Sequence, residues 1–170
     1  MSGAQYTLTG RLAVALPPVE AFTLFTPRGE EQWVAGWQPR FPVKTNDDSA
    51  PGTVFETGAH SERTIWVVVE REPGRRVSYA RVTPGSRAGT VTVEVDMDGQ
   101  GGSTVRVTYA LTALAPEGQG PLHEFAERYP NFLQSWEEEI ARHLGSRPPS
   151  AAAQCKRAHR RGRGPRSRSE

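Results

Sequence analysis

Glu56, Glu70 and Arg81 are polar residues of this sequence that could carry out acid–base chemistry on a carbonyl group. All three fall in stretches that alternate like β-strands. If one of them faced a cavity, burial would shift its pKa, and it could then polarise a bound carbonyl or transfer a proton. Strand alternation places Arg81 on the face of Val77 and Tyr79, so it shares a face with an aromatic ring. The alternative for each of the three is that it points into solvent.

A set of aromatic residues could line a pocket for an apolar or aromatic small molecule. Its members are Trp33, Trp37, Phe55, Trp66, Tyr79, Tyr109, Phe132 and Trp136, with Arg81 beside them if it faces inward. The alternative is that these rings pack against one another as a core without a cavity. Trp33 and Trp37 flank the start of a long connection, residues 35–52, so we expect them to act as gate residues of any pocket.

The histidines and the cysteine do not form the pattern of a metal site. His60, His123, His143 and His159 include neither an HExxH pair nor a His-x-Glu followed by paired cysteines. Cys155 is the only cysteine of the chain, so it cannot form an internal disulfide or a cysteine-based zinc site. The glycine-rich stretches have no strand-to-helix setting and are interpreted as turns. We therefore expect no metal and no cofactor.

Antiparallel strands are the elements that would position these side chains. The predicted strands are residues 6–15, 53–58, 63–71, 75–83, 90–98 and 103–113, and residues 41–44 could add a short seventh. Along 90–98 one face carries Val91, Val93, Val95 and Met97, and along 103–113 it carries Val105, Val107, Tyr109 and Leu111. Two short helices, within residues 19–25 and 29–34, follow the first strand. The sheet thus has one apolar face that needs a cover.

Residues 121–144 are predicted to form the helix that covers this face. Apolar residues recur there at intervals of three and four, which gathers on one side Leu122, Phe125, Ala126, Tyr129, Phe132, Leu133, Trp136, Ile140 and Leu144. Pro121 suits a first helical position, and Gly145 follows the last. Pro130 would remove a hydrogen bond and clash with the carbonyl of Ala126, at a cost of about 3 kcal/mol. We expect a kink there, or two helices that meet at Tyr129.

Charge divides the chain into a body, residues 1–146, and a tail, residues 147–170. The 170 residues carry 21 Lys and Arg against 19 Asp and Glu, a net charge of +2. The tail holds eight of the basic residues and one acidic residue, a charge of +7, which leaves 13 against 18 in the body, or −5. The tail has no large apolar residue, so we expect it to be disordered. It could contact nucleic acid or another anionic partner without sequence preference, but it has no aromatic residue to stack on bases.

The sequence contains neither a membrane span nor a signal peptide. No apolar run approaches the roughly 20 residues that a spanning helix needs, and the first residues lack the basic and apolar regions of a secretion signal. We expect a cytoplasmic protein. The sequence does not indicate an oligomeric state.

The order of strand, two short helices, antiparallel strands and long C-terminal helix resembles the START-like helix-grip superfamily, also called SRPBCC. Its bacterial polyketide cyclase/dehydrase-type members are similar in wording to LPPVEAFTLFTPRGEEQWVAGWQP, GTVFETG, TIWVVVEREPGRRVSYARVTPGSRAGTVTVEV and NFLQSWEEEIARHL. The resemblance covers residues 5–145 and omits the tail. It implies an α+β fold in which a curved antiparallel sheet of six strands, or seven, grips the long helix around an apolar cavity.

The resemblance leaves two functions open for that cavity. The first is binding of a hydrophobic or aromatic small molecule between the sheet and the long helix. The second is a cyclase, aromatase or dehydrase activity in which Arg81, Tyr79 and Glu56 act on a polyketide-like carbonyl. A third function, from another class, is contact of the basic tail with an anionic partner.

Overall fold

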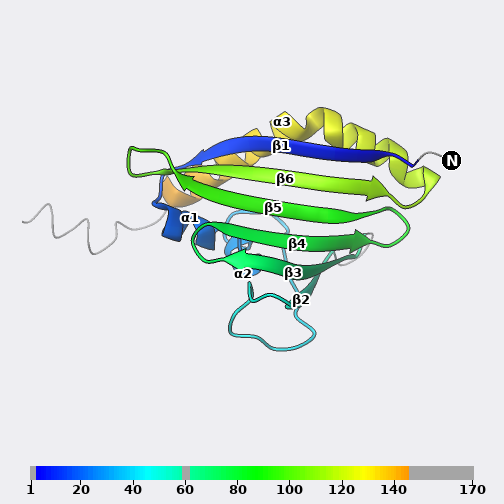
Figure 1. Cartoon of the computed structure of the whole chain (residues 1–170), viewed down its shortest axis with the longest axis horizontal. Helices are drawn as coiled ribbons and strands as arrows, with labels where there is room; N and C mark the ends of the chain where they lie inside the picture. Colours follow the sequence, from blue (N-terminus) through cyan, green and yellow to red (C-terminus); the bar gives the residue numbers. More distant parts are fainter. Residues whose placement is uncertain (1–2, 59–61, 146–170) are drawn as a thin grey trace, which may run out of the picture.

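The computed structural model of the chain describes residues 3–58 and 62–145. Its elements are β1 (Gln5–Val14), α1 (Pro18–Thr23), α2 (Pro27–Glu30), β2 (Val54–Thr57), β3 (Thr64–Glu72), β4 (Arg76–Thr83), β5 (Arg87–Met97), β6 (Ser103–Ala113) and α3 (Pro116–Gly145). The strands form one antiparallel sheet in the order β1-β6-β5-β4-β3-β2, as Figure 1 shows. The predicted six strands, two short helices and long helix are confirmed. Residues 41–44 form no strand. The only strand-like pairing beside them in the described chain is an isolated bridge between Arg40 and Glu56. The predicted tail, with its basic residues, lies outside the described residues.

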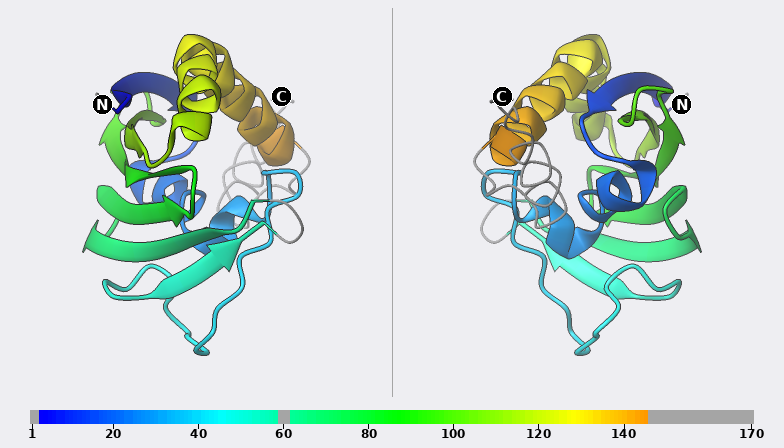
Figure 2. Two further views of the ribbon diagram at one scale, coloured as in Figure 1. Left: turned by 90° about the vertical axis from the view of Figure 1, so that its right-hand side faces the viewer. Right: turned by 90° about the vertical axis from the view of Figure 1, so that its left-hand side faces the viewer.

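The sheet is strongly curved, and α3 lies over one side of it. β1 pairs with β6 along its whole length, so the first and last strands in the chain are neighbours in the sheet. α3 packs on these two strands, while the sheet curls away from the helix toward β2 (Figure 2). α1 and α2 lie at one end of the concave face. Within the described residues no helix is long and apolar enough to cross a membrane.

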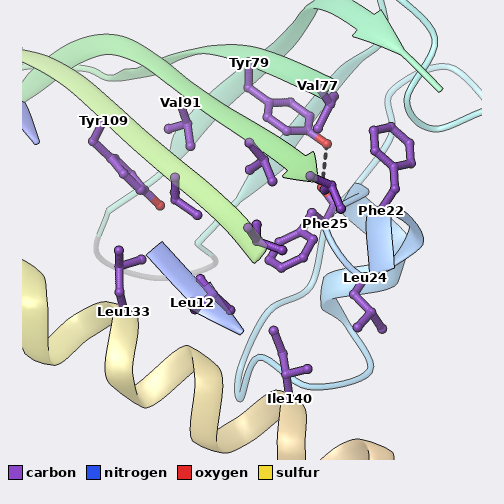
Figure 3. Close-up of a cluster of buried hydrophobic side chains, with 14 of the residues drawn as sticks. Leu12, Phe22, Leu24, Phe25, Val77, Tyr79, Val91, Tyr109, Leu133 and Ile140 are labelled. Atoms are coloured by element: carbon purple, nitrogen blue, oxygen red, sulfur yellow. Dashed lines mark hydrogen bonds between the residues drawn. The ribbon is translucent and has the colours of Figure 1, made fainter. Parts of the chain in front are cut away.

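The concave face of the sheet carries the core, as the alternation in the sequence predicts. The inward residues of β6 are all buried, namely Val105, Val107, Tyr109 and Leu111, and so are Val91, Val93 and Val95 of β5. Figure 3 shows Val91 and Tyr109 facing Leu133 of α3. Met97 was predicted to join this face, but its side chain is 80% exposed. It is the last residue of β5, where the hairpin leaves the covered part of the sheet.

α3 is a single helix that contains both Pro121 and Pro130. Of the two alternatives predicted at Pro130, a division into two helices at Tyr129 is wrong, because a single helix runs through it and arches over the sheet in Figures 1 and 2. The lost hydrogen bonds at proline allow such bending. The Tyr129 hydroxyl donates a 2.6 Å hydrogen bond to the carbonyl of Val107, which ties the middle of the helix to β6. At Gly10 of β1 a Cβ atom would overlap Leu133, so glycine lets α3 approach the sheet closely.

The connection between α2 and β2 is held by side-chain contacts. Arg71 of β3 places Nη1 2.6 Å from Oδ1 of Asp47 and 3.1 Å from the hydroxyl of Ser49. The backbone N–H of Arg28 donates to Asp48 at 2.8 Å. The hydrogen bond from Arg71 lowers the pKa of Asp47, so the carboxylate stays ionised at neutral pH. These contacts fix the wall that carries Trp37.

Candidate ligand-binding site

A cavity of about 280 Å³ lies between the concave face of the sheet, the α2 region and α3. Its volume is near the lower end of the range for small-molecule sites in proteins. It is lined by Pro27, Glu30, Val34, Trp37, Phe55, Thr57, Glu62, Thr64, Trp66, Tyr79, Arg81, Arg87, Val91, Val93, Tyr109, Phe132 and Trp136. The wall is therefore mainly aromatic, with a small number of charged side chains. This composition suits a flat, largely apolar molecule.

Eight residues of the predicted pocket meet around this cavity: Trp37, Phe55, Trp66, Tyr79, Arg81, Tyr109, Phe132 and Trp136. Trp33 is the member of the predicted set that does not line it. Its indole N–H donates to the carbonyl of Leu24 at 2.8 Å, and its ring packs edge-on against Phe25 and Trp136. Trp33 is thus a buried core residue behind the cavity wall rather than the gate residue that the sequence predicts.

The aromatic side chains form two facing groups. On the strand side, Phe55 and Trp66 stack with ring centroids 5.7 Å apart and an interplanar angle of 2°, and Trp37 meets both edge-on. On the helix side, Phe132 lies 5.0 Å from Trp136 and 6.1 Å from Tyr109. The first group comes from β2, β3 and the connection before β2, and the second comes from α3 and β6. They give the cavity rigid ring surfaces on both sides.

Glu56 does not line the cavity, so the prediction that it could act as an acid or base there is wrong. Phe55 points inward, so the next residue of β2 points to the opposite face. There Glu56 forms ion pairs with Arg63 and, at 3.0 Å, with Arg40. The hydrogen bond from Arg63 lowers the pKa of Glu56. It is an ionised surface carboxylate.

Tyr79 lines the cavity with its ring, but its hydroxyl is engaged elsewhere. The hydroxyl donates a 2.8 Å hydrogen bond to the carbonyl of Phe25, drawn as a dashed line in Figure 3. Burial raises the pKa of Tyr79 above its ordinary value, so the phenol stays protonated. The side chain therefore anchors the segment after α1 to β4. It offers the cavity an apolar ring edge.

Arg81 brings an unpaired positive charge to the cavity wall. Its Cζ lies 4.7 Å from the centroid of the Trp66 ring, a cation–π contact, and Nη2 is 3.3 Å from the Thr83 hydroxyl. Its Nε is buried without a hydrogen-bond partner, and Arg81 has no ion pair among the described residues. Burial lowers the pKa of Arg81, but a guanidinium remains charged at neutral pH. The sequence predicted this inward position as one of two alternatives.

Glu30 is a cavity residue that the sequence reasoning missed. It is the last residue of α2 and lines the cavity together with Val34 and Trp37. The intervals of four and three residues are those of one helical face, which is the signal that could have revealed it. Burial raises the pKa of Glu30 well above its usual range. The carboxyl therefore favours its neutral form much more than a surface carboxyl does.

The remaining titratable groups of the cavity are Tyr109 and the ion pair of Arg87 with Glu62. Burial raises the pKa of the Tyr109 hydroxyl, which thus remains a neutral phenol. Arg87 and Glu62 lie 3.6 Å apart. Both, together with Phe132, also line a more open hollow beside α3. These three residues line both hollows, whereas Trp37 lines the first alone.

The described residues contain no group of three or more His, Cys, Asp or Glu side chains that could hold a metal ion. His123 is hydrogen-bonded at 2.7 Å to the hydroxyl of Tyr6. His60, His159 and Cys155 lie outside the described residues. The titratable groups that line the cavity are arginines, carboxyl groups and phenols.

Comparisons with known proteins agree with this architecture. The family described as polyketide cyclase/dehydrase and lipid transport matches residues 6–161. A search of curated proteins gave no match. Among solved structures, an uncharacterized protein from Rhizobium leguminosarum is similar with a TM-score of 0.61 and 15% identity, over 83% of this chain and 97% of its own.

Two further solved structures are similar in the same way. A protein from Thermobifida fusca gives a TM-score of 0.61 at 21% identity, over 81% of this chain and 94% of its own. Norcoclaurine synthase from Thalictrum flavum gives 0.60 at 12% identity, over 86% and 90%. At these identities the likeness concerns the fold. The predicted helix-grip fold is confirmed.

Proposed function

This chain belongs to the polyketide cyclase/dehydrase and lipid transport family, whose members typically bind hydrophobic ligands in a cavity, and from that premise we propose a ligand class for it. The proposed ligand is a flat aromatic small molecule that carries a carboxylate or carbonyl oxygen. The rings of Trp66 and Phe132 would contact its apolar body, and Arg81 would bind the oxygen. The activity proposed is non-covalent binding.

The observation that carries this proposal is the unpaired guanidinium of Arg81 in an aromatic cavity. A buried charge without a partner costs folding free energy, so it persists where it serves a ligand. Arginine binds carboxylates through parallel hydrogen bonds, and a low-polarity surrounding strengthens such bonds. The Cζ atom of Arg81 lies over the Trp66 ring, and the guanidinium forms no ion pair among the described residues. An oxyanion bound in the cavity would supply the missing counter-charge.

We expect 2-naphthoate to bind the full chain saturably, with one site per chain, in an isothermal titration. The neutral isostere 2-naphthamide should bind at least about tenfold more weakly, because its amide gains only a neutral hydrogen bond at Arg81. The two probes share the same ring, so the ratio of their dissociation constants isolates the charge. Absence of saturable binding by 2-naphthoate, or equal affinities for the two probes, would contradict the proposal.

Catalysis on a carbonyl substrate is the second candidate function. It is favoured by the carboxyl of Glu30, whose pKa is raised and which lines the same cavity as Arg81. A guanidinium can stabilise developing oxyanion charge, and a carboxyl of raised pKa can transfer a proton. Of the residues predicted for this role, Glu56 lies outside the cavity and Tyr79 offers no free hydroxyl proton. An enzyme would lose more turnover than substrate affinity when Arg81 is replaced.

A further inference from the structure

The position of Glu30 is set by tight packing of α2. Thr26 caps the helix, its hydroxyl accepting the N–H of Gly29 at 3.1 Å, and Pro27 occupies the first turn. Gly29 fits so closely that a Cβ atom there would overlap the carbonyl of Thr23. The next residue, Glu30, is thereby aimed at the cavity that it lines.

The carboxyl of Glu30 has no partner within the described part of the chain. It forms neither a hydrogen bond nor an ion pair there, although Arg28 lies in the same helix and Arg81 lies in β4. The other titratable groups that line the cavity are Glu62 before β3, Tyr79 and Arg81 on β4, Arg87 on β5 and Tyr109 on β6. α3 contributes the uncharged rings of Phe132 and Trp136 to the same cavity. The carboxyl lines the cavity without a protein partner, so a ligand oxygen that approached it there would gain a hydrogen bond shielded from bulk solvent.

Glu30 and Arg81 are separate polar points of the cavity. They come from α2 and β4 and form no ion pair with each other, yet both act on the pKa of Tyr109. Arg81 lowers the pKa of that hydroxyl, and Glu30 raises it. Tyr109 thus lies within electrostatic reach of both. A flat molecule in the cavity can meet a cation at one point and a carboxyl at another.

We propose that Glu30 is a second polar anchor, which as a neutral carboxyl donates a hydrogen bond to an oxygen substituent of the ligand. The inference rests on the proposed function, because it needs a ligand whose carboxylate lies at Arg81. It names the ligand class more narrowly: aromatic carboxylates with a hydroxyl or alkoxyl group at the end remote from the carboxylate. Glu30 is then a specificity-determining residue of this cavity.

The test compares 2-naphthoate with 6-methoxy-2-naphthoate, whose ether oxygen only accepts hydrogen bonds. At a pH below the raised pKa of Glu30, the methoxy probe should bind the full chain about fivefold more tightly, which is the usual effect of one neutral hydrogen bond. Glu30→Ala should abolish this preference and leave the affinity for 2-naphthoate within about twofold. Glu30→Gln should keep it, because the amide N–H also donates.

The pH dependence follows from the raised pKa of Glu30. As the pH rises through that pKa, the carboxyl loses its proton and can no longer donate, so the parent's preference for the methoxy probe should disappear. In Glu30→Gln the preference should persist at every pH. Glu31→Gln, at the exposed neighbouring position, is the matched control and should behave as the parent. Glu30→Gln should fold at least as stably as the parent, because it resembles the neutral form that burial favours.

Two failures can be told apart. If 2-naphthoate itself does not bind, the proposed function is wrong and the role of Glu30 falls with it. If 2-naphthoate binds but the methoxy group gives no gain, or the gain survives in Glu30→Ala, the cavity binds aromatic carboxylates and the inference about Glu30 is overturned.

Discussion

Replacing Arg81 with methionine should weaken binding of 2-naphthoate by about thirtyfold or more, equivalent to about 2 kcal/mol. Methionine keeps the length of the side chain and its contact with the Trp66 ring, but it removes the only charge that we assign to the ligand carboxylate. The carboxylate would then enter an aromatic cavity without a counter-charge. Binding of the neutral 2-naphthamide should change much less. Isothermal titration of both probes measures the difference.

The same substitution should not lower the free energy of unfolding by more than about 1 kcal/mol, because Arg81 lacks an ion pair and its buried Nε lacks a partner. Arg76→Met is the matched control on the same strand. Arg76 forms ion pairs at 3.5 Å with Glu70 and Glu94, so it should leave naphthoate binding unchanged. A large loss of stability in Arg81→Met with unaltered affinity would make Arg81 a structural residue.

Phe25→Ala should destabilise the protein by about 3 to 5 kcal/mol, the usual cost of truncating a buried aromatic side chain. Phe25 has no exposed surface and does not line the cavity, and its ring lies 5.9 Å from that of Trp33. Trp136→Ala should cost about half as much, because part of the Trp136 ring faces the cavity rather than packed atoms. It should weaken 2-naphthoate binding, since it removes one of the ring surfaces.

Urea unfolding and ligand titration on the two variants separate core from site. The ring centroids of Phe25 and Trp136 are only 6.4 Å apart. Comparing the two variants therefore shows whether the packed core ends and the cavity wall begins between these two side chains. If Trp136→Ala proved as destabilising as Phe25→Ala and bound 2-naphthoate as the parent does, the helix side of the cavity would be close-packed core.

The sheet could be predicted from the sequence because each strand buries one face. In β6 the inward residues from Val105 to Leu111 alternate with outward polar or small residues without interruption. Shifting the strand pairing by one residue would turn this apolar face outward, so the alternation fixes the register of the strand. Met97 followed the same alternation but lies at a strand end. Alternation identifies a face, and it does not say how far the cover over that face extends.

The start of α3 was predicted five residues too late, at Pro121, because proline is favoured at the first position of a helix. Gly118 lies within the first turns of the helix, and a Cβ atom there would overlap the carbonyl of Ser86. This glycine provides space for the β4–β5 turn, so its role depends on a contact between distant segments. Such a contact leaves no local pattern in the sequence.

The candidate site was predictable where it lies on strands. Side chains alternate between the two faces of a strand, which placed Arg81 on the same face as Tyr79. The same alternation puts Glu56 on the face opposite Phe55, so the position of Glu56 could have been anticipated. Glu30 ends the short helix α2 and Trp33 lies in the turn after it, and the orientation of so short a segment depends on packing against the rest of the fold. That packing aims Glu30 at the cavity and buries Trp33 behind it.

The most direct test is a crystal structure of the full chain with 2-naphthoate bound. We expect the naphthalene ring between the side chains of Trp66 and Phe132, with the carboxylate oxygens about 3 Å from nitrogen atoms of Arg81. A naphthoate bound outside the cavity, or one inside it whose carboxylate points away from Arg81, would contradict the assignment.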